Sequence, residues 1–170
     1  MKKLALWALV LGVSAFGYGQ GGDQPHVSKT ATLKLMTLPV VPACAEFTSV
    51  EGDPMKGGAT IFFKTKTGCE IPWHWHTASE RLIMVSGKAK LEMKDHPAET
   101  FTAGDYALLT SKGIHQFTCL SSCVFYDITD AAFDIHYVKA DGTEIPAEEA
   151  LKAANKPKAP AKKAAAAPKG

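Results

Sequence analysis

The chain has 170 residues, of which 46% are hydrophobic and 21% charged, and its formal net charge is +2. This composition is typical of a folded globular domain and excludes a chain that is disordered throughout. The small net charge conceals a strong segregation of charge: residues 1–19 carry +2, residues 20–150 carry −6 and residues 151–170 carry +6. The protein therefore has an acidic central part and a basic C-terminal part.

The first residues have the pattern of a secretory signal peptide. Two lysines precede an apolar run over residues 4–16, and Gly17 and Gly19 are small residues of the kind that a signal peptidase reads. This run is short for a transmembrane helix, which needs about 20 apolar residues. We therefore expect residues 1–19 to be a cleaved signal peptide, the protein to be exported to the periplasm or secreted, and no stable membrane insertion. An uncleaved membrane anchor is the alternative.

The last residues have the composition of a disordered tail. Residues 153–170 are almost entirely Ala, Lys and Pro, which cannot bury enough surface to fold. No aromatic side chain is interleaved with the tail lysines, so the sequence predicts no nucleic-acid partner. We assign residues 151–170 to this tail, which either keeps the protein soluble or contacts an anionic surface. Residues 20–150 remain as one domain without an internal repeat.

Short segments separated by Gly- and Pro-containing turns predict a nearly all-β domain. Only residues 147–154 have a helical pattern. Evenly spaced strands of this kind form a sandwich or a barrel. The predicted strands are residues 32–36, 46–50, 59–65, 70–76, 81–85, 89–93, 99–102, 106–109, 115–119, 124–128 and 133–138.

Three histidines and one glutamate are the candidate metal ligands. Residues at positions i and i+2 of a strand point to the same face, so His74 and His76 are neighbours. Glu80 follows after a turn of three residues, and His115 lies in a later strand. Three imidazoles and a carboxylate suit a divalent first-row metal and leave coordination positions open. Taken alone, the His-x-His pair is equally compatible with a surface position.

The spacing of these residues resembles the first motif of the cupin superfamily. That motif is Gly, five residues, His-x-His, three or four residues, Glu, six residues and Gly. This chain matches every position of it, with Gly68, His74, His76, Glu80 and Gly87.

A second cupin motif is matched in part. Gly104 and His115 stand at the motif's separation, but Thr110 replaces a Pro, Lys112 replaces a Gly and Cys119 replaces an Asn. These departures weaken the turn before the histidine without moving the imidazole. The resemblance extends over most of the domain and implies a single-domain cupin, which is an all-β double-stranded β-helix or jelly-roll barrel of the RmlC-like type.

The resemblance also implies a function. Cupins with three His and one Glu are often metal-dependent dioxygenases that act on small organic molecules. We expect His74, His76, Glu80 and His115 to bind Fe, Mn, Ni, Cu or Zn, and Glu80 to serve also as a catalytic base. The alternative is a non-catalytic periplasmic protein that binds a metal or a small ligand. Many cupins dimerise through their sheets, so a homodimer is also expected.

Alternation along the strands predicts which side chains face the interior. The inward set consists of Leu82, Met84, Leu91, Met93 and Phe117. Trp73 or Tyr106 is expected near the mouth of the barrel.

Four cysteines follow the signal peptide and allow three pairings. Cys119 and Cys123 flank a short loop, across which a disulfide could form in an oxidising compartment. Cys44 and Cys69 would then form the second pair. The alternative is that Cys119 is a buried thiol.

Overall fold

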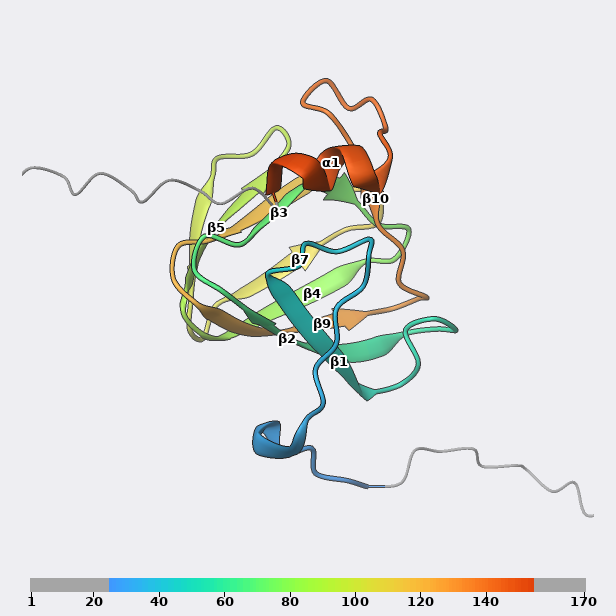
Figure 1. Cartoon of the computed structure of the whole chain (residues 1–170), viewed down its shortest axis with the longest axis vertical. Helices are drawn as coiled ribbons and strands as arrows, with labels where there is room; N and C mark the ends of the chain where they lie inside the picture. Colours follow the sequence, from blue (N-terminus) through green and yellow to red (C-terminus); the bar gives the residue numbers. More distant parts are fainter. Residues whose placement is uncertain (1–24, 155–170) are drawn as a thin grey trace, which may run out of the picture.

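A computed structural model describes residues 25–154 (Figure 1). The predicted signal peptide and residues 155–170 of the predicted tail lie outside the described residues. Two five-stranded antiparallel sheets face each other. In spatial order, the first contains β1 (Ala45–Glu51), β2 (Ala59–Thr65), β9 (Cys123–Thr129), β4 (Glu80–Ser86) and β7 (Tyr106–Leu109), and the second contains β10 (His136–Tyr137), β3 (Glu70–Trp75), β8 (His115–Cys119), β5 (Lys88–Met93) and β6 (Glu99–Thr102).

The chain passes repeatedly from one sheet to the other. Strands β2 and β3 lie in different sheets, as do β3 and β4, β4 and β5, and each successive pair from β6 to β10. This winding of antiparallel strands around a common interior is that of a jelly roll. The predicted all-β jelly-roll fold is confirmed.

The core lies between the sheets and follows from the alternation of side chains. Along β9 every second residue is buried, and β4 alternates in the same way over its first five residues. Aromatic rings fill the centre, where the centroid of Phe125 lies 5.0 Å from that of Phe63 and 5.1 Å from that of Phe117. Of the predicted inward residues, Leu82, Met84, Leu91 and Phe117 are buried and Met93 is partly buried.

Two predicted strands are wrong for most of their length. In the segment 32–36 only Met36 pairs, as an isolated bridge to Phe47, and Thr30–Thr32 forms a 3-10 turn. No side chain of that segment is buried, so nothing anchors it as a full strand. The segment 133–138 pairs as a strand only at β10, because residues 133–135 leave the sheet and cover one end of the barrel interior.

The predicted helix is present as α1 (Ala147–Ala154), beside β3 and β10 (Figure 1). Ala150 and Leu151 are buried against Tyr137. This packing makes the helix continue past residue 150, where we placed the end of the domain. Among residues 25–154 no helix has the length and apolar character needed to cross a membrane.

One disulfide joins Cys44 and Cys69, with their Cα atoms 5.5 Å apart. The predicted bridge between Cys119 and Cys123 is wrong, since both are free and buried. Cys119 faces the core, where its Sγ lies 2.9 Å from the Thr65 hydroxyl oxygen. The alternative of a buried thiol at Cys119 therefore describes this position.

Removing the disulfide should destabilise the barrel. The bond spans 25 residues. A crosslink that closes a loop of this length lowers the conformational entropy of the unfolded chain, which stabilises the folded state by about 3 kcal/mol. We expect Cys44→Ser/Cys69→Ser to lower the free energy of unfolding by about that amount in urea titrations. Reductant should weaken the wild type similarly and leave the double variant unchanged. Equal sensitivity of both proteins to reductant would contradict this assignment.

Candidate metal centre

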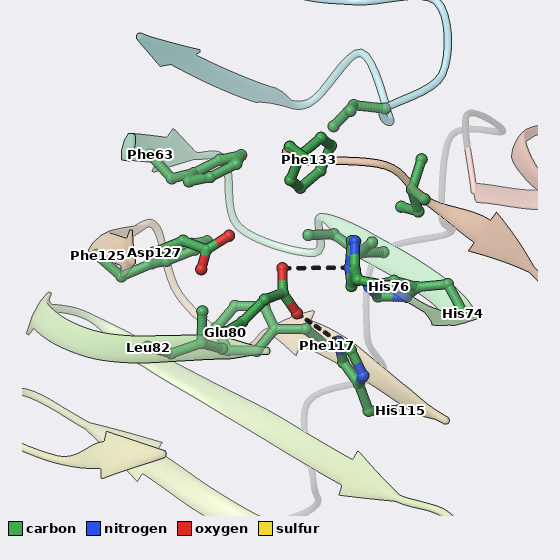
Figure 2. A pocket seen from close by; sticks show the side chains of 13 residues that line it. Phe63, His74, His76, Glu80, Leu82, His115, Phe117, Phe125, Asp127 and Phe133 are labelled. Carbon is green, nitrogen blue, oxygen red and sulfur yellow. Dashed lines mark ion pairs between the residues drawn. The ribbon is translucent and has the colours of Figure 1, made fainter. Parts of the chain in front are cut away.

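The four predicted ligands meet inside the barrel (Figure 2). His74 lies in β3, His76 follows that strand directly, Glu80 begins β4 and His115 begins β8. His74 and His115 are direct partners in the ladder between β3 and β8. All four residues are at most 4% exposed. One ligand atom from each histidine lies within 4.8 Å of those of the other two, so the three imidazoles are positioned to bind one metal ion.

Backbone carbonyls orient the three imidazoles. A carbonyl oxygen can only accept a hydrogen bond, so each Nδ1 that contacts one carries the proton and donates it. A neutral imidazole protonated at Nδ1 has its lone pair on Nε2, the atom left free for a metal. The Nδ1 atoms of His74, His76 and His115 donate to the carbonyl oxygens of Pro72 (2.6 Å), Asp134 and Gly113 (2.9 Å).

Burial keeps the imidazoles neutral. It lowers the pKa of His76 to about 3 and that of His115 to about 4, and it lowers the pKa of His74 well below the usual value. Their mutual repulsion, if charged, lowers the pKa values of His74 and His76 further. At neutral pH the three rings therefore need not lose a proton before they bind a metal.

Glu80 lies beside two of the three imidazoles. Its Oε1 lies 3.2 Å from Nε2 of His76, and its Oε2 lies 3.5 Å from Nε2 of His115 (Figure 2). Both nitrogens are acceptors in the tautomer fixed by the backbone, so an ionised carboxylate here faces only lone pairs. A divalent cation satisfies all of these groups together. Three imidazole nitrogens and one carboxylate oxygen thus fit a transition metal, whose identity they do not determine.

Asp127 is a further residue at this site, and its place there was not predicted from the sequence. This residue lies in β9, opposite Leu82 of β4, and its side chain is 3% exposed. Burial raises the pKa of Asp127 to about 7, and burial together with the neighbouring Asp127 raises the pKa of Glu80. The one signal in the sequence is the alternation that places Asp127 on the same face as Phe125.

The centre opens into a small apolar cavity of about 40 Å³. This volume holds a few water-sized groups and is far below the roughly 300–1,000 Å³ of pockets for drug-sized ligands. Neither Trp73 nor Tyr106 lines the cavity, and Tyr106 is exposed on β7, so their predicted place near the mouth is wrong. Apolar walls come from Val41, Phe63, Ile71, Leu82, Phe117, Phe125, Phe133 and Ile135.

The turn before His115 forms although the chain matches the second motif only in part. Lys112 stands where the motif has a glycine, and its backbone adopts a left-handed φ of 61°. Its N–H donates to the carbonyl oxygen of His76 at 2.8 Å, which ties the two motifs together. Its Nζ lies 5.9 Å from the ring centroid of Trp75. The position therefore keeps the conformation that glycine adopts easily, at a steric cost.

Comparisons with known proteins identify the family. A family model described as Cupin domain matches residues 61–129, a range that includes all four predicted ligands. This match identifies residues 61–129 as a cupin domain. A search of curated proteins gave no match.

Solved structures support the fold of this cupin. An RmlC-like cupin from Shewanella frigidimarina NCIMB 400 is similar with a TM-score of 0.54 and 15% identity, over 69% of this chain and 96% of that one. KdgF from Halomonas sp. has a TM-score of 0.51 and 15% identity, over 60% and 92%. The DMSP lyase DddQ from Ruegeria pomeroyi DSS-3 has a TM-score of 0.51 and 16% identity, over 59% of this chain and only 57% of the lyase. At these identities the likeness concerns the fold alone.

Replacing Lys112 with glycine should stabilise the protein. Lys112→Gly relieves a left-handed conformation that costs a residue with a side chain about 1 kcal/mol. We expect the free energy of unfolding to rise by about that amount in denaturant titrations. Lys112→Ala is the matched control, because it removes the contact with Trp75 but keeps the strain, and it should give no gain. A loss of stability in Lys112→Gly would show that the turn carries no strain.

The carboxyl of Glu80 should make metal-free protein less stable as pH rises. Burial raises its pKa well above the usual value for a glutamate, so the folded state holds a proton that the unfolded state loses. Stability from this group is present below about pH 4.5 and is lost as pH rises toward its folded pKa. In urea titrations with a chelator, the free energy of unfolding of Glu80→Gln should therefore rise relative to that of the wild type above pH 5, by up to about 1.4 kcal/mol per pH unit. A difference that does not change with pH would contradict the raised pKa.

Proposed function

We propose that this cupin binds one divalent transition-metal ion through His74, His76, Glu80 and His115 and acts there on a small organic molecule. The observation that carries the proposal is the set of three Nδ1–carbonyl hydrogen bonds, which leaves three neutral Nε2 atoms facing one point. Surface histidines have no such common orientation. The family supports a small molecule as the partner, because cupin barrels enclose their sites.

The histidines, Glu80 and the phenylalanines have separate roles in the proposed reaction. The histidines hold the ion, which when bound supplies Lewis acidity and, for redox-active metals, electron transfer. Glu80 is the group that takes a proton from the substrate, because its carboxyl lies between the imidazoles and the cavity. The phenylalanine walls exclude bulk water and strengthen the electrostatic interactions within the cavity.

The reaction class that we propose to test first is dioxygenation, as the resemblance of the ligand set implies. A cavity of about 40 Å³ favours compact substrates over polycyclic ones. The same small volume favours a second candidate, a protein that retains a metal or a small ligand without turnover. The predicted homodimer stays a prediction.

We further propose that the protein is exported to the periplasm or secreted. The N-terminal pattern of charge, apolar run and small residues supports this, and so does the disulfide between Cys44 and Cys69, since such bonds persist in oxidising compartments. Mass spectrometry of protein from the envelope fraction should find a mature N-terminus near residue 18 or 20. An intact first methionine would contradict cleavage.

Metal content tests the proposed centre. Protein purified from its native envelope fraction should contain about one transition-metal ion per chain by elemental analysis. His115→Ala should lose most of it, because removal of one of three imidazoles typically weakens such a site at least tenfold. His96→Ala is the matched control, since His96 is exposed and outside the centre, and it should keep the metal. Equal metal content in both variants would contradict the site.

Turnover separates the two candidate functions. The metal-loaded protein should consume oxygen with at least one member of a panel of small catechols and other compact phenols. Glu80→Gln should abolish this consumption if Glu80 is the base. Full metal loading with no consumption, together with tight retention of a small ligand, would favour the binding protein.

A further inference from the structure

Asp127 has a buried carboxyl group that the proposed metal ligands do not explain. It lies in the middle of its sheet, where β9 pairs with β2 on one side and β4 on the other. Its direct partners in the two ladders are Ile61 and Leu82, both buried. The backbone of Asp127 is therefore fixed, and its side chain faces the cavity on the wall away from the histidines (Figure 2).

Within residues 25–154, Oδ1 of Asp127 is buried without a hydrogen-bond partner. No lysine or arginine lines the cavity, and the neighbouring walls are the rings of Phe63, Phe125 and Phe133. A buried acceptor without a donor costs about 1–3 kcal/mol, and more if it is charged. This cost is recovered when a molecule in the cavity donates a hydrogen bond to that oxygen.

Asp127 is beside the centre and not part of it. Within residues 25–154 Asp127 forms no ion pair with a histidine, whereas Glu80 lies within 3.5 Å of His76 and His115. It reaches the centre through Glu80, whose carboxyl contacts both Asp127 and the imidazoles of His76 and His115. A molecule that holds the ion with one polar group would therefore present its next polar group to Asp127.

We propose that Asp127 determines substrate specificity: its unpartnered oxygen accepts a hydrogen bond from a hydroxyl or ammonium group on a small molecule whose oxygen binds at the metal centre. The inference rests on the proposed function and narrows its substrate class. The two polar groups of such a molecule are separated by about the breadth of one carboxyl group, as in small 2-hydroxy or 2-amino acids. The volume of about 40 Å³ suits compounds of this size.

Three nearly isosteric carboxylates test the role of Asp127 directly. Glycine, glycolate and propionate differ in the group beside the carboxylate-bearing carbon, which is ammonium, hydroxyl or methyl. Cobalt-loaded protein is titrated with each, and binding is followed by the visible absorption of the cobalt, so no turnover is required. We expect the wild type to bind glycine and glycolate at least about tenfold more tightly than propionate. This difference is the effect of one hydrogen bond to a charged acceptor.

The variants assign that preference to one oxygen. Asp127→Ala should remove most of it, and Asp127→Asn, which preserves size and an acceptor oxygen but not the charge, should reduce it. Asp95→Asn is the matched control, because Asp95 is an exposed acid outside the cavity, and it should leave the preference unchanged. Cobalt content and urea unfolding are measured for every variant.

The outcomes separate this inference from the proposed function. A wild type that binds no cobalt contradicts the proposed centre and the inference with it. Two results overturn the inference alone: cobalt binding with no preference among the three probes, or a preference in both Asp127 variants that equals that of the wild type. Loss of cobalt from folded Asp127→Asn would show that Asp127 supports the centre itself and would also overturn the specificity role.

Discussion

Three hydrogen bonds from imidazole Nδ1 atoms to backbone carbonyl oxygens determine what the centre of this barrel can do. They hold three neutral histidines in the same tautomer, so that three lone pairs face inward. The carbonyls belong to separate parts of the fold, namely Pro72 in β3, Gly113 in the turn before β8, and Asp134 in the segment after β9. The donor set therefore exists only when the barrel is closed, because no single segment supplies all three acceptors.

When Glu80 and Asp127 are ionised, the polar groups that face the cavity are all acceptors of hydrogen bonds. Besides the three Nε2 atoms there are two carboxyl groups, Glu80 and Asp127, and burial raises the pKa of each. A cation near the imidazoles satisfies one part of this excess, and a donor-bearing molecule near Asp127 satisfies the rest. We therefore propose that metal binding and substrate selection both relieve this excess, each at one of the two contacting carboxyl groups.

The sequence predicts that the four candidate ligands lie together, because their spacing reflects local geometry. Strand alternation places His74 and His76 on one face, and motif spacing adds Glu80 and His115. The left-handed turn at Lys112 explains why the altered second motif still delivers its histidine. Asp127 escaped prediction because an acid in an alternating strand is ordinarily on the outer face, and only the packing of the two sheets reveals which face is inside.

Other differences have the same origin. A short loop between Cys119 and Cys123 suggests a bridge, but the core side of β8 accommodates Cys119 as a thiol beside Thr65. The residues before Met36 have strand-like composition but bury no side chain, so pairing is limited to that one position. In each case the missing information is which face of a segment is covered by the opposite sheet.

The tautomers of the three buried histidines are the sharpest test of the proposed centre. Long-range proton–nitrogen correlation spectra of ¹⁵N-labelled, metal-free protein at pH 7 distinguish a protonated nitrogen from a free one in each ring. The account predicts that His74, His76 and His115 are all neutral, with the proton on Nδ1 and the lone pair on Nε2. A proton on Nε2 of any of the three, or a charged imidazolium among them, would contradict it.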